Sequence, residues 1–358
     1  MCGTCFFRRL LSRLSFLLVV GIPLALLAQE PLPPVQPTIP SPPGQPPSEP
    51  STTEDEPVTT FKAGVDLVQL FFNVKDKKGA LLPALSKDDF QVLEDGKPQT
   101  IKYFAAESNL PLTLGILVDT SGSMQRVLDM EKEVGSAFLN DILRDKDLAF
   151  ILSFDVNVDL LQDFTNSKRA LKAGLERAQI NTGGGGAGPI PGISGGGPVP
   201  TANVPRGTLL YDAIYLASHD QLAKEVGRKA MIILTDGQDY GSRLVLKDAI
   251  EAAQKADSIC YVLLIADRQF YGGDYYGDSE MKKLAAETGG RVIEVGNKFE
   301  KLKAAFGQIA AELRSQYSIG YTPANAKKDG TFRKVEVRST SGYKIQARAG
   351  YYAIAKQD

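Results

Sequence analysis

Short apolar runs alternate with longer amphipathic stretches through the middle of the chain, and this rhythm limits the fold more than any other feature. Leu112–Val118, Leu148–Phe154, Ala230–Thr235 and Ile259–Ala266 have the length and composition of buried strands. The other elements we expect here are helices at Met130–Leu143, Lys168–Ala178, Leu209–Lys224, Leu244–Ala256, Glu280–Glu287 and Phe299–Arg314, an edge strand at Val158–Phe164 and a short strand at Val292–Val295. Because strands that alternate with helices pair in parallel, the sequence predicts a doubly wound, mostly parallel α/β sheet.

The segments on either side of this region show β patterns instead. Residues 61–104 contain alternating apolar runs and the hairpin signal Asp95-Gly96. In the second segment strands are expected at Tyr317–Tyr321, Arg333–Ser339 and Tyr343–Ala349. Neither segment alone has enough strands for a stable sandwich. We therefore predict that residues 61–108 and 316–353 form one small β-sandwich-like domain, into which an α/β domain at 109–315 is inserted.

The N-terminal 28 residues have the pattern of an export signal. Arg8, Arg9 and Arg13 precede the apolar run Phe16–Leu27, which ends at Ala28. The run is short for a membrane span, and an uncleaved N-terminal anchor is the alternative interpretation. In either case the rest of the chain is expected to be exported to the periplasm, the cell envelope or the extracellular space.

Residues 29–60 are rich in proline, with eleven prolines between Pro31 and Pro57. Such a segment cannot bury a core, and it is either an extended spacer or a disordered N-terminal region. Cys2 and Cys5 lie in the predicted export signal, so Cys260, inside an apolar run, is the only cysteine left in the mature chain. No disulfide framework is expected, and the fold must be stabilised by packing.

The overall charge argues against two classes of partner. The formal net charge is -1, and the basic pairs are short. A nucleic-acid-binding surface normally needs a basic patch, so we expect no nucleic-acid partner. Contact with a membrane is expected only through an uncleaved N-terminal anchor.

Oxygen-bearing side chains follow two of the predicted strands. Asp119, Ser121 and Ser123 come directly after the strand at 112–118, and Asp236 comes after the strand at 230–235. Thr208 stands at the start of a predicted helix between them. Ligands of open α/β sheets bind outside the carboxyl ends of the strands, so these side chains are expected to face one crevice.

These residues resemble the metal-ion-dependent adhesion site of von Willebrand factor A domains, which has the pattern D-x-S-x-S followed by a threonine and an aspartate. The resemblance covers residues 110–314 and implies that Asp119, Ser121, Ser123, Thr208 and Asp236 hold a metal. In that family the hydroxyl groups bind the metal directly, while the aspartates act largely through water. The resemblance implies a binding protein and not an enzyme.

The flanking segments carry a second resemblance. Leu82–Lys97 and Arg348–Tyr352 are similar to exported bacterial proteins of the von Willebrand factor A-related acidobacterial family. This likeness fits the inserted-domain prediction and names no ligand.

Hard oxygen donors with no accompanying histidine or cysteine favour Mg²⁺, with Mn²⁺ and Ca²⁺ as alternatives, and argue against zinc. Neutral hydroxyl ligands leave much of the cation's charge uncompensated. We therefore expect a protein ligand that donates an Asp or Glu carboxylate to the metal.

Parts of the sequence also suggest two other functional classes. If the aspartates only cap helices and the serines only form turns, the chain is a structural cell-envelope protein with a vestigial metal site. An α/β hydrolase is nominally suggested by Gly192-Ile193-Ser194-Gly195-Gly196, but no strand precedes it and His219 is the only histidine. The glycine pattern at 183–188 lies in low-complexity sequence, and the acidic pattern at 155–159 lacks the residues that complete a calcium loop.

Two loops are candidates for contact with a partner. Asn181–Arg206 is long, rich in glycine and proline, and ends just before Thr208, so it either contacts the ligand or is a disordered insertion. Phe270–Gly277 combines tyrosines with glycines, as binding loops do, although packing on its own domain is an equally good interpretation.

Overall fold

The computed structural model describes residues 67–107, 110–181, 207–265 and 277–354. The predicted export signal, the proline-rich segment, nearly all of the glycine- and proline-rich loop and most of the tyrosine loop lie outside these residues. Within the described part, no helix has the length and apolar character that a membrane span requires.

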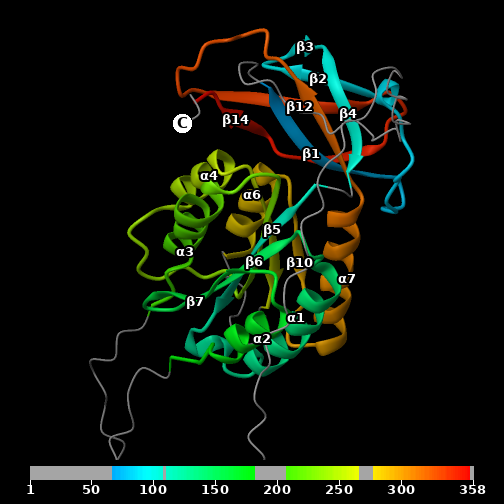
Figure 1. Ribbon diagram of the computed structural model, residues 1–358. Coiled ribbons are helices and arrows are strands. Elements are labelled where there is room, and N and C mark those ends of the chain that lie inside the picture. The colour runs from blue at the N-terminus through cyan, green and yellow to red at the C-terminus, as the bar shows by residue number, and fades with distance from the viewer. Residues whose placement is uncertain (1–66, 108–109, 182–206, 266–276, 355–358) are drawn as a thin grey trace, which may run out of the picture. The chain divides into compact units, whose positions relative to one another are not determined.

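A six-stranded sheet forms the centre of the α/β region (Figure 1). Its order is β10-β9-β8-β5-β6-β7, and every neighbouring pair is parallel except β6 and β7. The strands are β5 (Leu112–Asp119), β6 (Leu148–Phe154), β7 (Val158–Thr165), β8 (Arg228–Thr235), β9 (Ser258–Leu264) and β10 (Val292–Glu294). The strand order changes direction between β5 and β8, and this topological switch point is where such sheets bind ligands.

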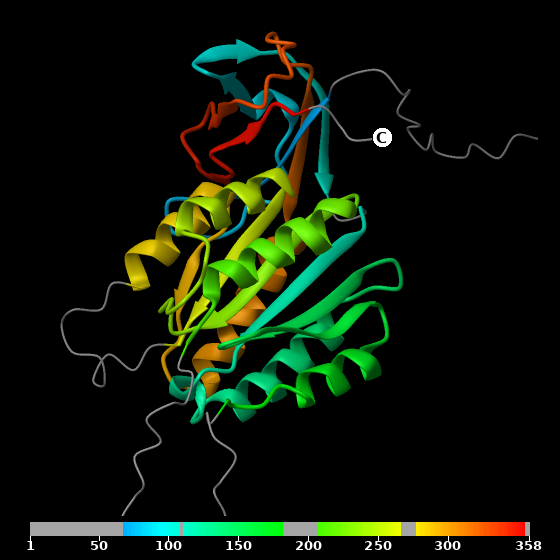
Figure 2. The ribbon, with the colours of Figure 1, turned by 90° about the vertical axis from the view of Figure 1, so that its left-hand side faces the viewer.

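Helices cover both faces of this sheet (Figure 2). One face packs against α1 (Leu128–Ile142), α2 (Lys168–Glu176) and α7 (Phe299–Arg314). The other packs against α3 (Leu210–Leu216), α4 (Leu246–Lys255) and α6 (Gly277–Thr288). All residues of β5, β8 and β9 are buried, as expected for central parallel strands covered on both faces. The predicted doubly wound α/β sheet is confirmed.

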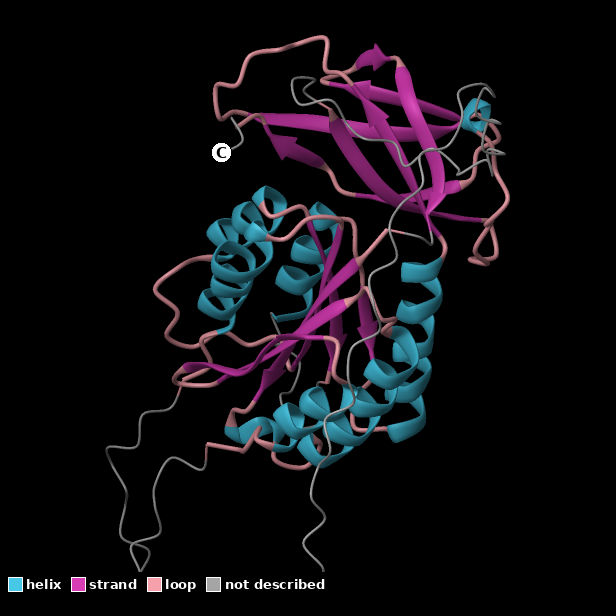
Figure 3. Cartoon of the chain, in the orientation of Figure 1, coloured by secondary structure: helices cyan, strands magenta, loops and turns pink. Residues whose placement is uncertain are grey.

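Strands from the two flanking segments pair with each other in two further sheets, drawn in magenta with the other strands in Figure 3. The first has the order β13-β1-β11-β4 and the second the order β14-β12-β2-β3. The strands before the α/β region are β1 (Val68–Lys75), β2 (Phe90–Glu94), β3 (Lys97–Gln99) and β4 (Ile101–Glu107), and those after it are β11 (Gln316–Tyr321), β12 (Phe332–Ser339), β13 (Lys344–Ala347) and β14 (Gly350–Tyr352). Each sheet therefore needs both segments, as predicted.

One apolar core joins these two sheets into a sandwich. Phe72 of β1 and Tyr317 of β11 stack at 5.7 Å between ring centroids, and Phe72 also meets the edge of Phe90 from β2 at 5.2 Å. The hairpin between β2 and β3 turns at Asp95 and Gly96, which both have positive φ, as its two-residue loop requires. The domain boundaries at 61–108, 109–315 and 316–353 stay a prediction, because the described residues form one compact unit.

Several element boundaries differ from the sequence expectation. The helix predicted from Leu209 to Lys224 is an α-helix only to Leu216 and continues as a π turn and a 3₁₀ turn to Lys224. The strand predicted to end at Ala349 ends at Ala347, and β14 begins at Gly350. Between them Ala349 donates its N–H to the carbonyl of Glu287 at 3.1 Å, a contact outside the β sheets that interrupts the strand.

Candidate metal centre

Asp119 is the last residue of β5 and is fully buried at the switch point of the sheet. Its Oδ1 accepts a hydrogen bond from the backbone N–H of Ser121 at 2.9 Å, and its Oδ2 accepts one from the hydroxyl of Thr235 at 2.7 Å. The Thr235 hydroxyl in turn accepts from the N–H of Gly237 at 3.0 Å. The end of β8 therefore fixes the orientation of the carboxylate at the end of β5.

The two serines of the motif lie against each other. The Oγ atoms of Ser121 and Ser123 are 2.9 Å apart. Ser121 stands at the N-cap of a short 3₁₀ turn, Gly122–Met124, yet its side chain makes no capping hydrogen bond. The two hydroxyl groups are therefore gathered at one point and are not used to terminate a helix. Ser121 is buried and Ser123 is exposed, so this pair reaches from the interior to solvent.

Thr208 is tied to the loop that follows Asp236. Its N–H donates to the carbonyl of Tyr240 at 2.9 Å, and the N–H of Tyr240 donates back to the carbonyl of Thr208 at 2.9 Å. Both Thr208 and Asp236 are buried. The N–H of Gln238 binds Oδ1 of Asp236 at 3.0 Å, so this aspartate, like Asp119, uses one oxygen to brace a local turn.

Asp155, just after β6, accepts hydrogen bonds from residues that are next in sequence to Ser121 and Thr208. Its Oδ2 accepts from the hydroxyl of Thr120 at 2.9 Å, and its backbone carbonyl accepts from the N–H of Leu209 at 2.8 Å. Its Oδ1 accepts from the N–H of Asn157 at 3.0 Å. The acidic pattern at 155–159 thus forms the turn between β6 and β7 and braces residues next to Ser121 and Thr208.

Burial and a second carboxylate shift the acidity of Asp119. Burial is the larger cause and the negative charge of Asp236 the second, and together they raise the pKa of Asp119 to about 7. Burial also raises the pKa of Glu131 on α1, with the charge of Asp119 as a further cause. Carboxylates so close in a low-dielectric environment favour a bound cation.

The donor set fits a hard divalent cation. It offers two carboxylates and three hydroxyl groups, and no histidine or cysteine belongs to it. Among the described residues no group of three or more His, Cys, Asp or Glu side chains lies close enough together to hold a metal. Any metal here must therefore be bound through the hydroxyl groups as well as the aspartates.

The remaining candidates from the sequence have ordinary positions or lie outside the described part. His219 is exposed, stacks on Tyr215 at 5.2 Å and faces Asp220, with Nδ1 2.8 Å from Oδ1. Cys260 is buried in β9, which raises the pKa of its thiol to about 12. The glycine patterns at 183–188 and 192–196 fall outside the described residues.

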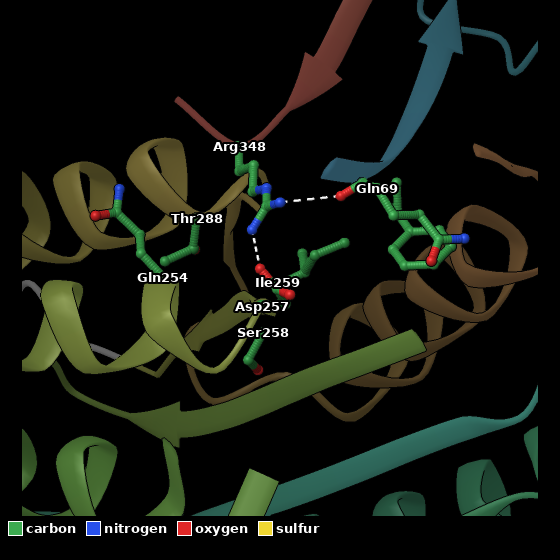
Figure 4. Close-up of a pocket in the computed structure, with 8 residues that line it drawn as sticks. Gln69, Gln254, Asp257, Ser258, Ile259, Thr288 and Arg348 are labelled. Atoms are coloured by element: carbon green, nitrogen blue, oxygen red, sulfur yellow. Dashed lines mark hydrogen bonds and ion pairs between the residues drawn. The ribbon is translucent and has the colours of Figure 1, made fainter. Parts of the chain in front are cut away.

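A small pocket lies at the end of the sheet opposite to the candidate metal centre, where β9 begins (Figure 4). Ser258 and Ile259 line it together with Arg348, which forms an ion pair with Asp257 and donates to the carbonyl of Gln69 at 2.9 Å. Because it lies at the amino ends of the strands, this pocket is separate from the candidate metal centre.

Three residues brace this centre from outside its ligand set, and the sequence did not predict these roles: Thr235, Asp155 and, through its backbone, Tyr240. Thr235 was visible as the polar residue before Asp236, but its contact with Asp119 requires β5 and β8 to be neighbours. The roles of Asp155 and Tyr240 depend on backbone hydrogen bonds between distant loops, which leave no local pattern.

No family model matches the chain, and no curated protein matches its sequence. Similar solved structures include proximal thread matrix protein 1 from the mussel byssus (12% identity, TM-score 0.45, 62% of this chain and 51% of that chain). BatB from Bacteroides thetaiotaomicron (19%, 0.41, 57% and 100%) and a von Willebrand factor type A protein from Catenulispora acidiphila (14%, 0.43, 83% and 76%) are also similar. The chain spans about half the length of the mussel protein, which has also been solved with zinc in its MIDAS motif.

Proposed function

We propose that this chain is an exported, adhesion-type von Willebrand factor A protein that binds a protein partner through a divalent cation. Asp119, Ser121, Ser123, Thr208 and Asp236 hold the cation, with Mg²⁺ preferred. The observation that carries this proposal is the buried Asp119, with both oxygens already oriented and a pKa raised to about 7 by burial and, second, by the charge of Asp236.

The electrostatics support a cation. Burying an ionised carboxylate without a counter-charge is costly, and here two carboxylates share one end of the sheet. Asp119 and Asp236 would hold a divalent cation that offsets that cost, and the hydroxyls of Ser121, Ser123 and Thr208 would supply neutral ligands to it.

The exposure of the site supports binding by a large partner. Ser123 is exposed while Asp119, Asp236, Ser121 and Thr208 are buried, so the site reaches solvent at the hydroxyl group of Ser123. An Asp or Glu side chain of a partner can approach the cation from the solvent side. Neutral ligands on that side leave the cation able to attract such an anion.

A catalytic role has no comparable support among the described residues. The only histidine, His219, is exposed, and its ring pairs with Asp220 and stacks on Tyr215. The proposal is therefore a binding protein. The N-terminal sequence motivates two further parts of this proposal, export and location in the cell envelope. The flanking sequences motivate a third, the likeness to the acidobacterial family.

A structural protein with a vestigial site is the second candidate. One observation favours it, because Asp119 and Asp236 each brace a turn two residues ahead. The two candidates differ in metal binding. A functional site is stabilised by its ion, whereas a vestigial one unfolds at the same temperature with or without it.

The first test is therefore metal binding by calorimetry and thermal unfolding. We expect Mg²⁺ or Mn²⁺ to bind at one site and to stabilise the fold by about 3 kcal/mol at a hundredfold excess over the Kd. Asp119→Ala should abolish both effects, because it removes the buried carboxylate. Asp88→Ala, an exposed aspartate in the turn Lys87–Asp89, is the matched control and should bind like the wild type. Equal metal binding by Asp119→Ala and the wild type would reject the assignment.

Partner binding is tested with the protein immobilised and exposed to cell-envelope extract in Mg²⁺ or in EDTA. We expect capture that EDTA reverses and that Ser121→Ala weakens. Shortening the loop at 182–206 should change affinity or partner choice and leave metal binding intact, because that loop leads directly into Thr208. A partner retained equally in EDTA and by Asp236→Ala would move the interaction to another surface.

A further inference from the structure

Tyr240 is a large aromatic side chain placed beside the candidate metal centre and directed to solvent. Its side chain is 62% exposed, among the highest values of the large hydrophobic residues. It lies four residues after Asp236, in the loop that follows β8. The Tyr240 side chain is therefore accessible to another molecule.

The backbone of Tyr240 is paired with that of a proposed metal-binding residue. Tyr240 and Thr208 exchange both of their backbone hydrogen bonds, each 2.9 Å long, in an antiparallel bridge. In such a pair the two Cα atoms are about 5.5 Å apart and the two side chains project to the same side. The side chains of Tyr240 and Thr208 therefore leave the backbone on the same side of this bridge.

The loop that carries Tyr240 is fixed on both sides. Asp239 accepts hydrogen bonds from the N–H of Tyr211 at 3.1 Å and from the hydroxyl of Ser242 at 2.6 Å. Asp212 of α3 accepts from the N–H groups of Arg243 and Leu244 at 3.1 and 3.0 Å. A partner that contacts Tyr240 therefore does not have to order this loop, which lowers the entropic cost of binding.

We propose that Tyr240 is a specificity-determining contact that binds an apolar side chain of the partner next to the carboxylate that reaches the metal. This inference rests on the proposed metal-bridged function. An extended peptide advances about 3.3 Å per residue and the Cα atoms of Tyr240 and Thr208 are about 5.5 Å apart, so the Tyr240 side chain can reach residues one to three positions from that carboxylate. A tyrosine ring offers apolar area and a polar tip, which suits an acidic residue flanked by an apolar one.

The test uses the full chain and a peptide array in which each peptide has a central Asp and varied neighbours. Binding is measured in Mg²⁺ and again in EDTA. The wild type should prefer peptides with an apolar residue one to three positions from the Asp and release them in EDTA. Tyr240→Ala should lose this preference and bind the best peptides about tenfold more weakly, while Tyr240→Phe keeps the preference.

The controls separate this inference from the proposed function. Tyr103→Ala removes a tyrosine that is 46% exposed on β4, and it should bind peptides like the wild type. Tyr240→Ala should bind Mg²⁺ normally, because Thr208 pairs with its backbone and not its ring. If Tyr240→Ala keeps the wild-type preference, the inference is wrong and the metal-bridge function stands. If no peptide binds in an EDTA-sensitive manner, both are wrong.

Discussion

At the scale of single residues, the carboxyl group of Asp119 lies in an environment that favours its protonated form. Its pKa is raised from 3.8 to about 7, first by burial and then by the charge of Asp236. Between these two values the folded protein holds a proton that the unfolded chain has lost. Stability from this group is fully present below pH 3.8 and is lost as pH rises through 7, by up to about 4 kcal/mol in the metal-free protein.

A neutral substitution at Asp119 should therefore stabilise the metal-free protein. In EDTA at pH 8, Asp119→Asn should raise the free energy of unfolding in urea by roughly 1–4 kcal/mol, because it removes a buried charge and keeps the shape of the side chain. The gain should vanish near pH 4, where the wild-type carboxyl is protonated. The same variant should lose Mg²⁺ binding.

The control for this prediction is Asp88→Asn: Asp88 is exposed, so this variant should match the wild type in stability at both pH 4 and pH 8. A lower stability of Asp119→Asn than of the wild type at pH 8 would show that the hydrogen bonds from Thr235 and Ser121 outweigh the charge.

The acidity of Asp119 also sets the pH dependence of metal binding. Near and below pH 7 the incoming cation must displace a proton from this carboxyl group. Mg²⁺ affinity should thus fall as pH drops from 8 to 6, and calorimetry in two buffers of different ionisation enthalpy measures the proton released. Proton release that is absent at pH 6.5 would contradict the raised pKa.

At the scale of elements, the sequence predicted strands and helices well where burial alone decides them. The central strands β5, β8 and β9 are buried throughout, and their bounds agree with the predicted apolar runs within two residues. Periodicity failed where a distant contact decides the backbone. The break between β13 and β14 depends on Arg348, which pairs with Asp257, and on Ala349, which binds the carbonyl of Glu287.

Two glycines should respond to alanine in opposite directions because their surroundings differ. A Cβ added at Gly290, between α6 and β10, would meet the carbonyl oxygen of Cys260 on β9 at 1.9 Å, whereas one added at Gly307 inside α7 meets nothing within 4 Å. Gly290→Ala should lower the free energy of unfolding by about 3 kcal/mol. Gly307→Ala should raise it by about 0.5–1 kcal/mol, because alanine favours a helix.

Urea unfolding of both variants at pH 7 tests this pair. Equal stability of Gly290→Ala and the wild type would mean that the turn before β10 yields more easily than its backbone contacts indicate.

At the scale of the whole chain, Glu312 of α7 links the α/β region to the flanking strands. It is buried, and its Oε1 lies 2.8 Å from Nζ of Lys75 on β1 and 2.8 Å from Nε of Arg291. Gln346 of β13 donates to its other oxygen at 3.3 Å. The sequence predicted that the flanking segments pair with each other, from their strand count, but it gave no sign of this network.

We propose that residues 109–315 form a domain that folds alone. Because its junction with the flanking strands is polar, we expect the isolated domain to be less stable than the full chain. A fragment of residues 110–314 should fold and bind Mg²⁺, because the metal centre and both cores of the sheet lie within it. Its Tm should be lower than that of the full chain by on the order of 5–10 °C, since Glu312 loses Lys75. A fragment that shows no cooperative unfolding would contradict the inserted-domain organisation.

The pairing of β1 has a mechanical consequence under the alternative interpretation in which the N-terminal segment stays as an uncleaved anchor. Tension on residues that precede Val68 passes first into β1, which is an inner strand paired with β11 on one side and β13 on the other. Pulling β1 free must break both ladders together, whereas an edge strand could be peeled one bond at a time. The flanking sandwich thus acts as an anchor that resists load before the α/β sheet is strained.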